Sequence, residues 1–172
     1  MDKQSAIYTA FLKELETHKG IIYKISYSFC KTKADCQDLT QEIIIKLWQS
    51  FVTYRPFSKN STWIYRVSLN TAISFYRKEK TRNRIITTTH DSLLQLAEAA
   101  PAANRETDEK IAYLHQFLLA LKEMDRALMI LYLEGKTLKE IAEIMGISPT
   151  NVSTKINRIK VVLKERFSKL NY

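Results

Sequence analysis

The chain has 172 residues, a net charge of +9, and only three Gly, three Pro and two Cys. Its 45% of apolar and 26% of charged residues are typical of a globular protein and exclude a disordered one. Because turn-forming residues are so few, the composition excludes a sandwich or barrel of many short strands and favours long helices with short connections.

Neither a membrane span nor an export signal is evident along the chain. No window holds about 18 consecutive apolar residues, so we expect no membrane insertion. The first residues, Met-Asp-Lys-Gln-Ser, lack the basic patch and apolar run of a secretory signal. We therefore expect a cytoplasmic protein in which Cys30 and Cys36 are buried thiols, since two cysteines cannot form a disulfide framework.

Apolar residues at helical spacing predict four helices in the N-terminal half, and these are expected to form a compact bundle. The first helix spans residues 5–17, and the second runs from about residue 20 to 30. The third covers about residues 35–52 and the fourth about residues 61–80. The segment between the third and fourth helices contains Pro56, which ends the helical pattern.

The helical period is lost over residues 86–108, which we interpret as a flexible linker with a short helical turn at 93–99. Residues 85–110 have a net charge of −3, whereas residues 1–84 carry +8 and residues 111–172 carry +4. Two basic blocks on separate domains favour a polyanion such as nucleic acid as the partner. The predicted fold is therefore all-α, with helical domains at 5–85 and 109–170, the second built from helices near 109–122, 125–133, 138–145 and 149–168.

The pattern from Thr137 to Val152 predicts a helix-turn-helix. Thr137 and Glu140 have capping-box spacing, Gly146 suits a left-handed helix end, and Pro149 suits the first position of the next helix. Core-facing residues of that helix recur through Val152, Ile156, Ile159 and Leu163. The opposite face is polar and basic, as a recognition helix for the DNA major groove requires, and presents Asn151, Thr154, Lys155, Asn157 and Arg158. An ordinary helical hairpin with a solvated outer face is the alternative.

The third predicted helix is apolar on one side and mixes acids and amides with large apolar residues on the other. That composition indicates either a central helix of the bundle or a protein interface. For Trp48 itself, core packing and an interface role stay equally open. The mixed side carries Asp38, Gln41, Glu42 and Gln49 among Ile45, Trp48 and Val52.

The fourth predicted helix combines aromatic, amide and guanidinium groups on one stripe: Trp63, Arg66, Asn70, Ser74 and Arg77. The preceding loop adds aromatic and basic residues, namely Tyr54, Arg55, Phe57 and Lys59. Rings stack on unpaired bases while cations hold the backbone, so this region is predicted to bind single-stranded DNA. A solvated basic helix end with a core Trp is the alternative.

Together these motifs resemble bacterial sigma factors. Asp35, Asp38-Leu39, Gln41-Glu42 and Trp48, followed by Trp63-x-Tyr65-Arg66-Val67, Asn70-x-Ala72 and Arg77, are similar to sigma region 2. Leu121–Gly135 and Thr137–Arg158 are similar to regions 4.1 and 4.2. Because region 3 and an N-terminal regulatory region are absent, the layout resembles the extracytoplasmic-function (ECF) sigma factors.

The resemblance implies binding to core RNA polymerase, recognition of a duplex −35 element, and melting and reading of a −10 element. It assigns polymerase contact to Asp38, Gln41, Glu42 and Trp48, and places the −10 contacts in loop 53–60 and the Trp63 stripe. It assigns −35 contact to Asn151, Ser153, Lys155, Asn157, Arg158 and Lys160. An anti-sigma factor is a further expected partner.

Two other functions remain possible from the residues alone. A helix-turn-helix repressor or activator explains the C-terminal half but not the mixed face of the third predicted helix. A helical-bundle enzyme would need catalytic or metal-binding clusters. The three His residues (His18, His90 and His115) are scattered, are expected at the surface, and form no metal-ligand motif. We therefore expect no catalytic residue, no metal and no cofactor.

Overall fold

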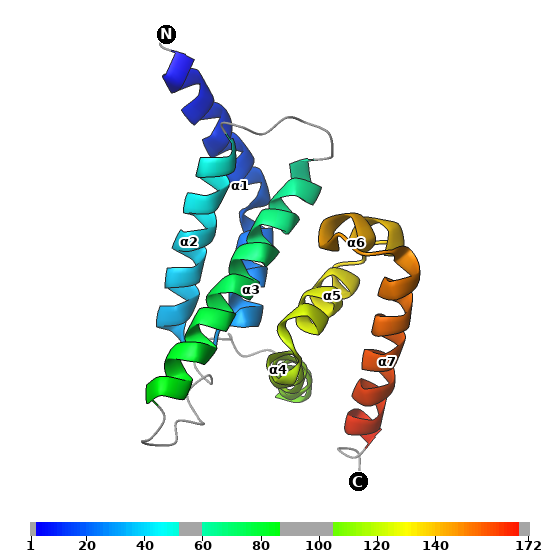
Figure 1. The fold of residues 1–172 in the computed structure, drawn as a ribbon. Helices are drawn as coiled ribbons and strands as arrows, with labels where there is room; N and C mark the ends of the chain where they lie inside the picture. The colour runs from blue at the N-terminus through cyan, green and yellow to red at the C-terminus, as the bar shows by residue number, and fades with distance from the viewer. Residues whose placement is uncertain (1–2, 52–59, 87–104, 169–172) are drawn as a thin grey trace. The chain divides into compact units, whose positions relative to one another are not determined.

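The computed structural model describes residues 3–51, 60–86 and 105–168. Within these ranges it contains seven helices and no strand (Figure 1), which confirms the predicted all-α fold. The chain divides into two compact units, Met1–Leu93 and Leu94–Tyr172. The division falls within the predicted linker. The helical turn expected at 93–99 lies outside the described residues.

The N-terminal unit is a bundle of three helices, α1 (Lys3–Phe29), α2 (Lys33–Phe51) and α3 (Asn60–Ile86), each of which packs against the other two. Its core is formed by apolar side chains that recur at helical spacing on all three helices, and burying them supplies most of the driving force for folding. The most deeply buried include Ile22, Ile25, Leu39, Ile43, Leu47, Ile64 and Leu69.

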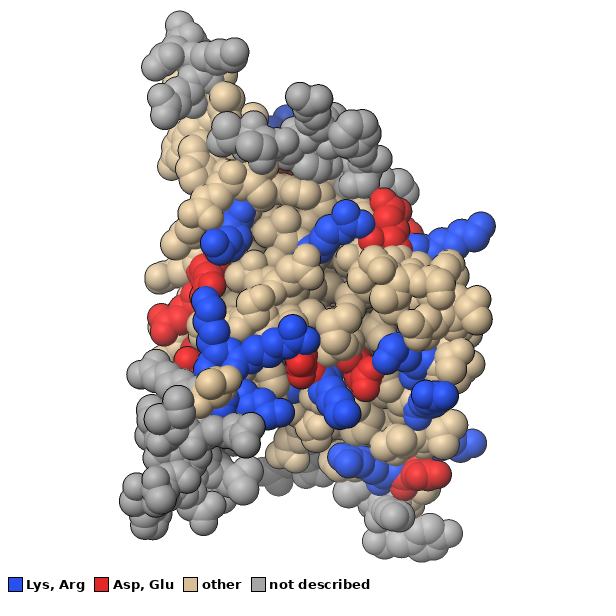
Figure 2. Space-filling model, in the orientation of Figure 1, with Lys and Arg blue, Asp and Glu red and all other residues tan. Residues whose placement is uncertain are grey.

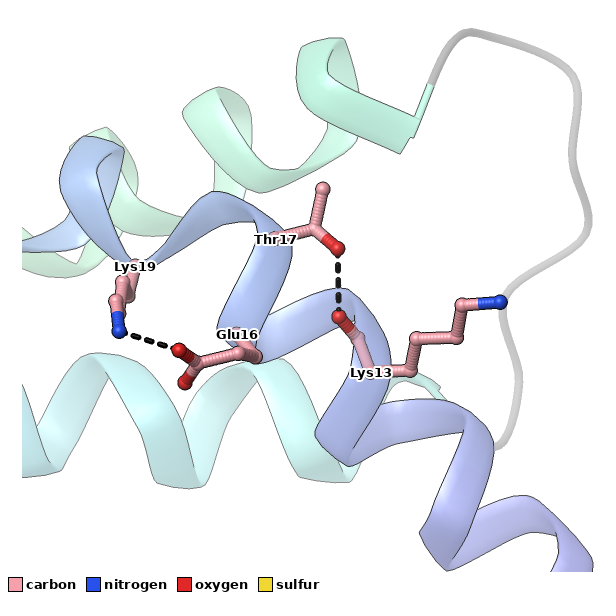
Figure 3. A network of polar contacts seen from close by, with 4 residues as sticks. All are labelled: Lys13, Glu16, Thr17 and Lys19. Atoms are coloured by element: carbon pink, nitrogen blue, oxygen red, sulfur yellow. Dashed lines mark hydrogen bonds and ion pairs between the residues drawn. The ribbon is translucent and has the colours of Figure 1, made fainter.

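The prediction of two separate helices over residues 5–30 was wrong, because α1 runs through Gly20 without a break. Around this position Thr17 donates a hydrogen bond to the Lys13 carbonyl oxygen at 2.8 Å, and Lys19 pairs with Glu16 (Figure 3). A glycine inside a helix costs only about 1 kcal/mol relative to alanine. That cost is too small to break a helix that buries Ile22 and Ile25 in the core.

The helix α3 also extends beyond its predicted end near residue 80 and continues to Ile86. No Gly or Pro occurs between residues 60 and 86, so nothing in the sequence stops the helix. In its last turns Thr81 donates a hydrogen bond to the Arg77 carbonyl oxygen at 3.0 Å.

The C-terminal unit consists of α4 (Arg105–Ala120), α5 (Glu123–Leu133), α6 (Leu138–Met145) and α7 (Pro149–Ser168). Here α5 packs against each of the other three helices, and α6 packs against α7. Its core includes Phe117 and Leu118 of α4, Met129 of α5 and Ile159 of α7. The bounds predicted for α6 and α7 match the structure, while α4 and α5 begin a few residues earlier than predicted.

A buried guanidinium joins α4 to α5. The side chain of Arg126 is completely buried. Its Nε donates a hydrogen bond to the Leu118 carbonyl oxygen at 2.8 Å, and one terminal nitrogen donates to the carbonyl oxygens of Leu119 at 2.7 Å and Leu121 at 3.1 Å. Leu118 and Leu119 lie in the last turn of α4 and Leu121 directly follows it, where most carbonyl oxygens lack a helical amide. The Leu118 carbonyl oxygen also accepts a hydrogen bond from the Leu121 amide at 3.1 Å.

The predicted helix-turn-helix is confirmed in its local chemistry. The Thr137 hydroxyl accepts a hydrogen bond from the Glu140 amide at 3.2 Å, and the Thr137 amide donates to the Glu140 carboxylate at 2.9 Å. Gly146 ends α6 in the left-handed conformation, with φ of 68°. The Ser148 hydroxyl then accepts a hydrogen bond from the Asn151 amide at 3.2 Å and so caps α7.

Two expectations about single residues require correction. His115 was expected at the surface but is buried, because it lies on the side of α4 that also carries Leu118. Of the two free cysteines, Cys30 is buried but Cys36 is only half-buried. The Cys36 thiol contacts the Ser26 carbonyl oxygen at 3.9 Å, and its burial raises the pKa of this thiol.

The continuity of α1 predicts that Gly20→Ala stabilises the N-terminal unit by about 0.5–1 kcal/mol. A methyl group added at Gly20 would meet no heavy atom within 4 Å, so the substitution reduces unfolded-state freedom without a clash. Urea unfolding followed by Trp fluorescence measures this unit alone, since both Trp residues, Trp48 and Trp63, belong to it.

The matched control is Gly146→Ala, which is expected to destabilise the C-terminal unit because its φ is positive. Hydrogen exchange of α6 and α7 amides measures that effect. A Gly20→Ala protein that unfolds at lower urea concentration than the wild type would contradict a continuous α1.

Candidate nucleic-acid interface

The outer face of α7 is polar and faces away from the core of its unit. Val152, Ile156 and Ile159 on the opposite face are buried. Among the seven residues predicted to contact duplex DNA, five are exposed: Asn151, Thr154, Asn157, Arg158 and Lys160. Ser153 and Lys155 are half-buried at the edges of that face. The helix can therefore offer amide, hydroxyl and guanidinium groups to base edges.

Two lysines of α7 contact side chains of α5. Lys155 Nζ lies 3.7 Å from Asp125 Oδ1. Lys160 Nζ donates a hydrogen bond to the Tyr132 hydroxyl at 3.2 Å and lies 5.2 Å from the centre of that ring. These contacts hold both lysine side chains of α7 against α5. Asp125 and Tyr132 could not be predicted from the sequence as neighbours of these lysines, because their approach to α7 depends on how the two helices pack.

Along α3, four of the five residues in the predicted single-strand stripe are exposed: Arg66, Asn70, Ser74 and Arg77. They follow one another at spacings of three or four residues and so lie on one face of the helix. The fifth residue, Trp63, is half-buried. The loop residues Tyr54, Arg55, Phe57 and Lys59 lie outside the described residues.

A cluster of aromatic rings connects the three N-terminal helices. The Trp48 ring packs edge-on against Tyr8 and Phe11, with centroid separations of 5.7 and 5.1 Å. Phe11 packs against Phe51 at 5.4 Å, and Phe51 packs against Trp63 at 6.0 Å. Trp48 and Trp63 were predicted to contact different partners, yet both rings belong to this cluster and contribute to the packing of the bundle.

The mixed side of α2 forms an outer face. Asp38, Gln41 and Ile45 are exposed, and the Ile45 side chain retains 53% of its accessible surface. Glu42 lies at the edge of this face, and its carboxylate is 3.8 Å from the Lys78 ammonium of α3. Trp48 is half-buried against α1. Of the four predicted polymerase-contact residues, Asp38 and Gln41 are therefore the most accessible.

Basic side chains are concentrated near the proposed DNA-contact surfaces. Figure 2 shows Lys and Arg side chains over the C-terminal half of α3 and along α7. On α3 the exposed ones include Arg77, Lys78 and Lys80, and on α7 they include Arg158, Lys160 and Lys164. Clustered positive charge of this kind attracts the phosphate backbone independently of sequence.

Neither a metal-binding cluster nor a membrane-spanning helix occurs in the described part of the chain. Within residues 3–51, 60–86 and 105–168, no three His, Cys, Asp or Glu side chains lie close enough together to hold a metal ion. Across the same ranges, no helix has the length and apolar character needed to cross a membrane.

Two regions of the chain match known protein families, in the order expected from the sequence. Residues 15–82 match the family Sigma-70 region 2, and residues 111–163 match Sigma-70, region 4. The first match covers most of the three-helix bundle. The second contains α5 and α6 entirely and most of α4 and α7.

The sequences of known proteins align with nearly the whole chain. RNA polymerase sigma factor SigV of Bacillus subtilis is 28% identical over 170 residues, which is 98% of each chain. ECF RNA polymerase sigma factor SigX of the same organism is 28% identical over 163 residues, covering 90% of this chain and 82% of SigX.

Two solved structures share the fold at 18% identity. One is CnrH in complex with the cytosolic domain of CnrY, with a TM-score of 0.67 and coverage of 94% of this chain and 90% of that chain. The other is the sigma factor RpoE in complex with the anti-sigma factor NepR from Bartonella quintana. Its TM-score is 0.71, with coverage of 92% of this chain and 97% of that chain.

The aromatic cluster predicts that stability and DNA contact can be separated along α3. Trp63→Ala should lower the free energy of unfolding of the N-terminal unit by roughly 2 kcal/mol, less than a fully buried ring would lose. Asn70→Ala, at an exposed position, should change it by no more than about 0.5 kcal/mol. Urea unfolding followed by tryptophan fluorescence measures both variants, since Trp48 remains in each. Equal losses in the two variants would show that Trp63 does not support the bundle.

Proposed function

Because the chain belongs to the extracytoplasmic-function sigma factors of RNA polymerase, we propose that its two units divide promoter recognition by the form of DNA that each contacts. As a sigma factor it binds core RNA polymerase and directs initiation at specific promoters. The observation that carries the proposed division is the exposed polar face of α7 in a helix-turn-helix with caps at both ends of α6 and at the start of α7.

In the C-terminal unit, α7 enters the major groove of the −35 element. Asn151, Thr154, Asn157 and Arg158 approach base edges, and Ser153, Lys155 and Lys160 contact the backbone from the edges of the face. Only Arg158 in this set can make the planar two-bond contact that arginine makes to guanine. Phosphate contacts and groove shape therefore contribute much of the recognition.

In the N-terminal unit, the exposed stripe of α3 holds the melted strand of the −10 element. Arg66 and Arg77 contact phosphates, while Asn70 and Ser74 offer hydrogen bonds to unpaired bases. The loop residues Tyr54, Arg55, Phe57 and Lys59 precede α3 directly in sequence and supply the stacking surface for a flipped base. The exposed part of Trp63 lies next to that loop in sequence and extends this surface.

Core polymerase contacts the outer face of α2. Asp38 and Gln41 supply polar groups around the exposed Ile45, an arrangement that resembles the centre of a protein interface. Glu42 contributes a negative charge at the edge of this face, and its carboxylate also lies close to the Lys78 ammonium. Trp48 supports this face from within the aromatic cluster.

The remaining parts of the proposal follow from the family. The chain acts in the cytoplasm, where core polymerase and DNA are located, and it has no catalytic activity of its own. An anti-sigma factor regulates it. This last point is supported by the solved relative RpoE, which is bound to the anti-sigma factor NepR.

The experiment that tests the proposal is transcription in vitro from a library of bacterial DNA fragments, with core polymerase in the presence and absence of the full chain. Sequencing of the transcript 5′ ends should show start sites that depend on the chain and share two upstream sequence elements. Starts without a shared upstream element would contradict promoter-specific initiation.

The accessible face of α2 predicts that Asp38→Arg weakens binding to core polymerase at least tenfold, because like charges that meet at an interface cost several kcal/mol. Fluorescence anisotropy of the labelled full chain, titrated with core polymerase, measures the affinity. Glu16→Arg is the matched control, since it makes the same change of charge at an exposed position of α1. Equal affinity of the two variants would remove the α2 face from the polymerase interface.

The division of DNA contacts predicts different defects for two exposed positions. Arg158→Ala should weaken binding of the polymerase complex to −35 duplex by about 1–3 kcal/mol, if it reads a base edge. Asn70→Ala should leave duplex binding unchanged and reduce opening of the −10 region, as detected by permanganate reactivity of unpaired thymines. A duplex-binding defect in Asn70→Ala with normal opening would reverse the assignment.

A further inference from the structure

An acidic side chain lies at the edge of the surface that α7 presents to DNA. Asp125 Oδ1 is 3.7 Å from Lys155 Nζ, and the two side chains retain 30% and 39% of their accessible surface. Both charges are therefore within reach of solvent and of any ligand that approaches α7. Asp125 belongs to the first turn of α5, which also carries Glu123.

The two lysines that contact α5 differ in the charge of their partners. Lys160 donates to the Tyr132 hydroxyl, a neutral acceptor, so its positive charge remains available to a phosphate. Lys155 instead lies beside a full negative charge. A phosphate that binds Lys155 must therefore compete with a carboxylate, and it also experiences repulsion from that carboxylate.

We propose that Asp125 competes with the DNA backbone for Lys155, and that it thereby limits the affinity and the salt dependence of −35 binding. This inference rests on the proposed function of α7. Asp125 therefore changes the affinity for the −35 element without contacting a base. While the pair persists in the docked complex, Lys155 is held by the carboxylate and neutralises no phosphate, so one fewer cation contacts the DNA backbone.

The expected change in DNA affinity is small because the Asp125–Lys155 ion pair is partly exposed. Partly exposed ion pairs contribute little in water, and breaking one corresponds to a change in affinity of up to about fivefold. Each lysine that neutralises a phosphate also releases condensed counterions, which steepens the dependence of log K on log salt by about 0.9. Removal of Asp125 should therefore change affinity modestly and the salt slope measurably.

The test compares Asp125→Asn with the wild-type full chain in complex with core polymerase. The probe is a closed duplex that carries the upstream element found in the transcription experiment. Asp125→Asn should bind about two- to fivefold more tightly at low salt and show a steeper salt slope. Unchanged affinity and slope would overturn the inference. A wild-type complex without preference for that duplex would instead contradict the proposed function.

Glu123→Gln is the matched control, because it removes the same charge from the same helical turn. It is expected to leave both the affinity and the salt slope close to those of the wild type. Circular-dichroism melting of both variants checks that the loss of an acid near the start of α5 affects folding equally in the two. If Glu123→Gln strengthens binding as much as Asp125→Asn does, the effect is a general one of net charge and the inference fails.

A double-mutant cycle with Lys155→Gln separates competition from simple repulsion. In the Lys155→Gln background, Asp125→Asn should leave the salt slope unchanged and lose most of its effect on affinity. A gain in affinity as large as in the wild-type background would show that Asp125 acts on DNA directly and not through Lys155.

Discussion

The arrangement of the C-terminal unit depends on the buried guanidinium of Arg126. A charge without any exposed surface is costly unless hydrogen bonds replace its hydration, and the carbonyl oxygens of Leu118, Leu119 and Leu121 provide them. These carbonyls lie at the negative end of the α4 dipole, which stabilises the positive charge. The same bonds satisfy the end of α4 and fix the position at which α5 begins.

The position of α7 follows from that constraint. Leu128, Met129 and Leu131 of α5 are almost completely buried in the unit whose other helices all pack against α5. The capping box of α6 and the left-handed Gly146 then set the direction in which α7 begins. A helix-turn-helix of this kind presents its outer face as a rigid surface, which favours the reading of bases with little loss of conformational freedom.

Features that are governed by residues close together in the sequence could be predicted from the sequence. The capping box, the Gly146 turn and the bounds of α6 and α7 depend on contacts within a few positions and were therefore accessible. The prediction that the helix breaks at Gly20 was wrong, because tertiary burial of α1 outweighs the weak helix propensity of one glycine.

Features that depend on packing between helices were not accessible from the sequence. The burial of His115, the position of Trp48 within the aromatic cluster and the approach of Asp125 to Lys155 each require knowledge of how two helices meet. In the N-terminal unit this changes the interpretation of the aromatic residues. Trp48 and Trp63 support the bundle, while the exposed polar residues of α2 and α3 remain the candidates for direct contact.

The proposed division of promoter recognition requires that α7 contacts duplex DNA and α3 contacts the melted strand. It is tested most directly by photo-crosslinking from a benzophenone amino acid placed at Asn157 or at Asn70, in the promoter complex with core polymerase. Asn157 is expected to crosslink to the upstream duplex both on ice and at temperatures that permit melting. Asn70 is expected to crosslink to the downstream element, on one strand, only after melting. Crosslinks from Asn70 to closed duplex on ice, or from Asn157 to the melted strand, would contradict it.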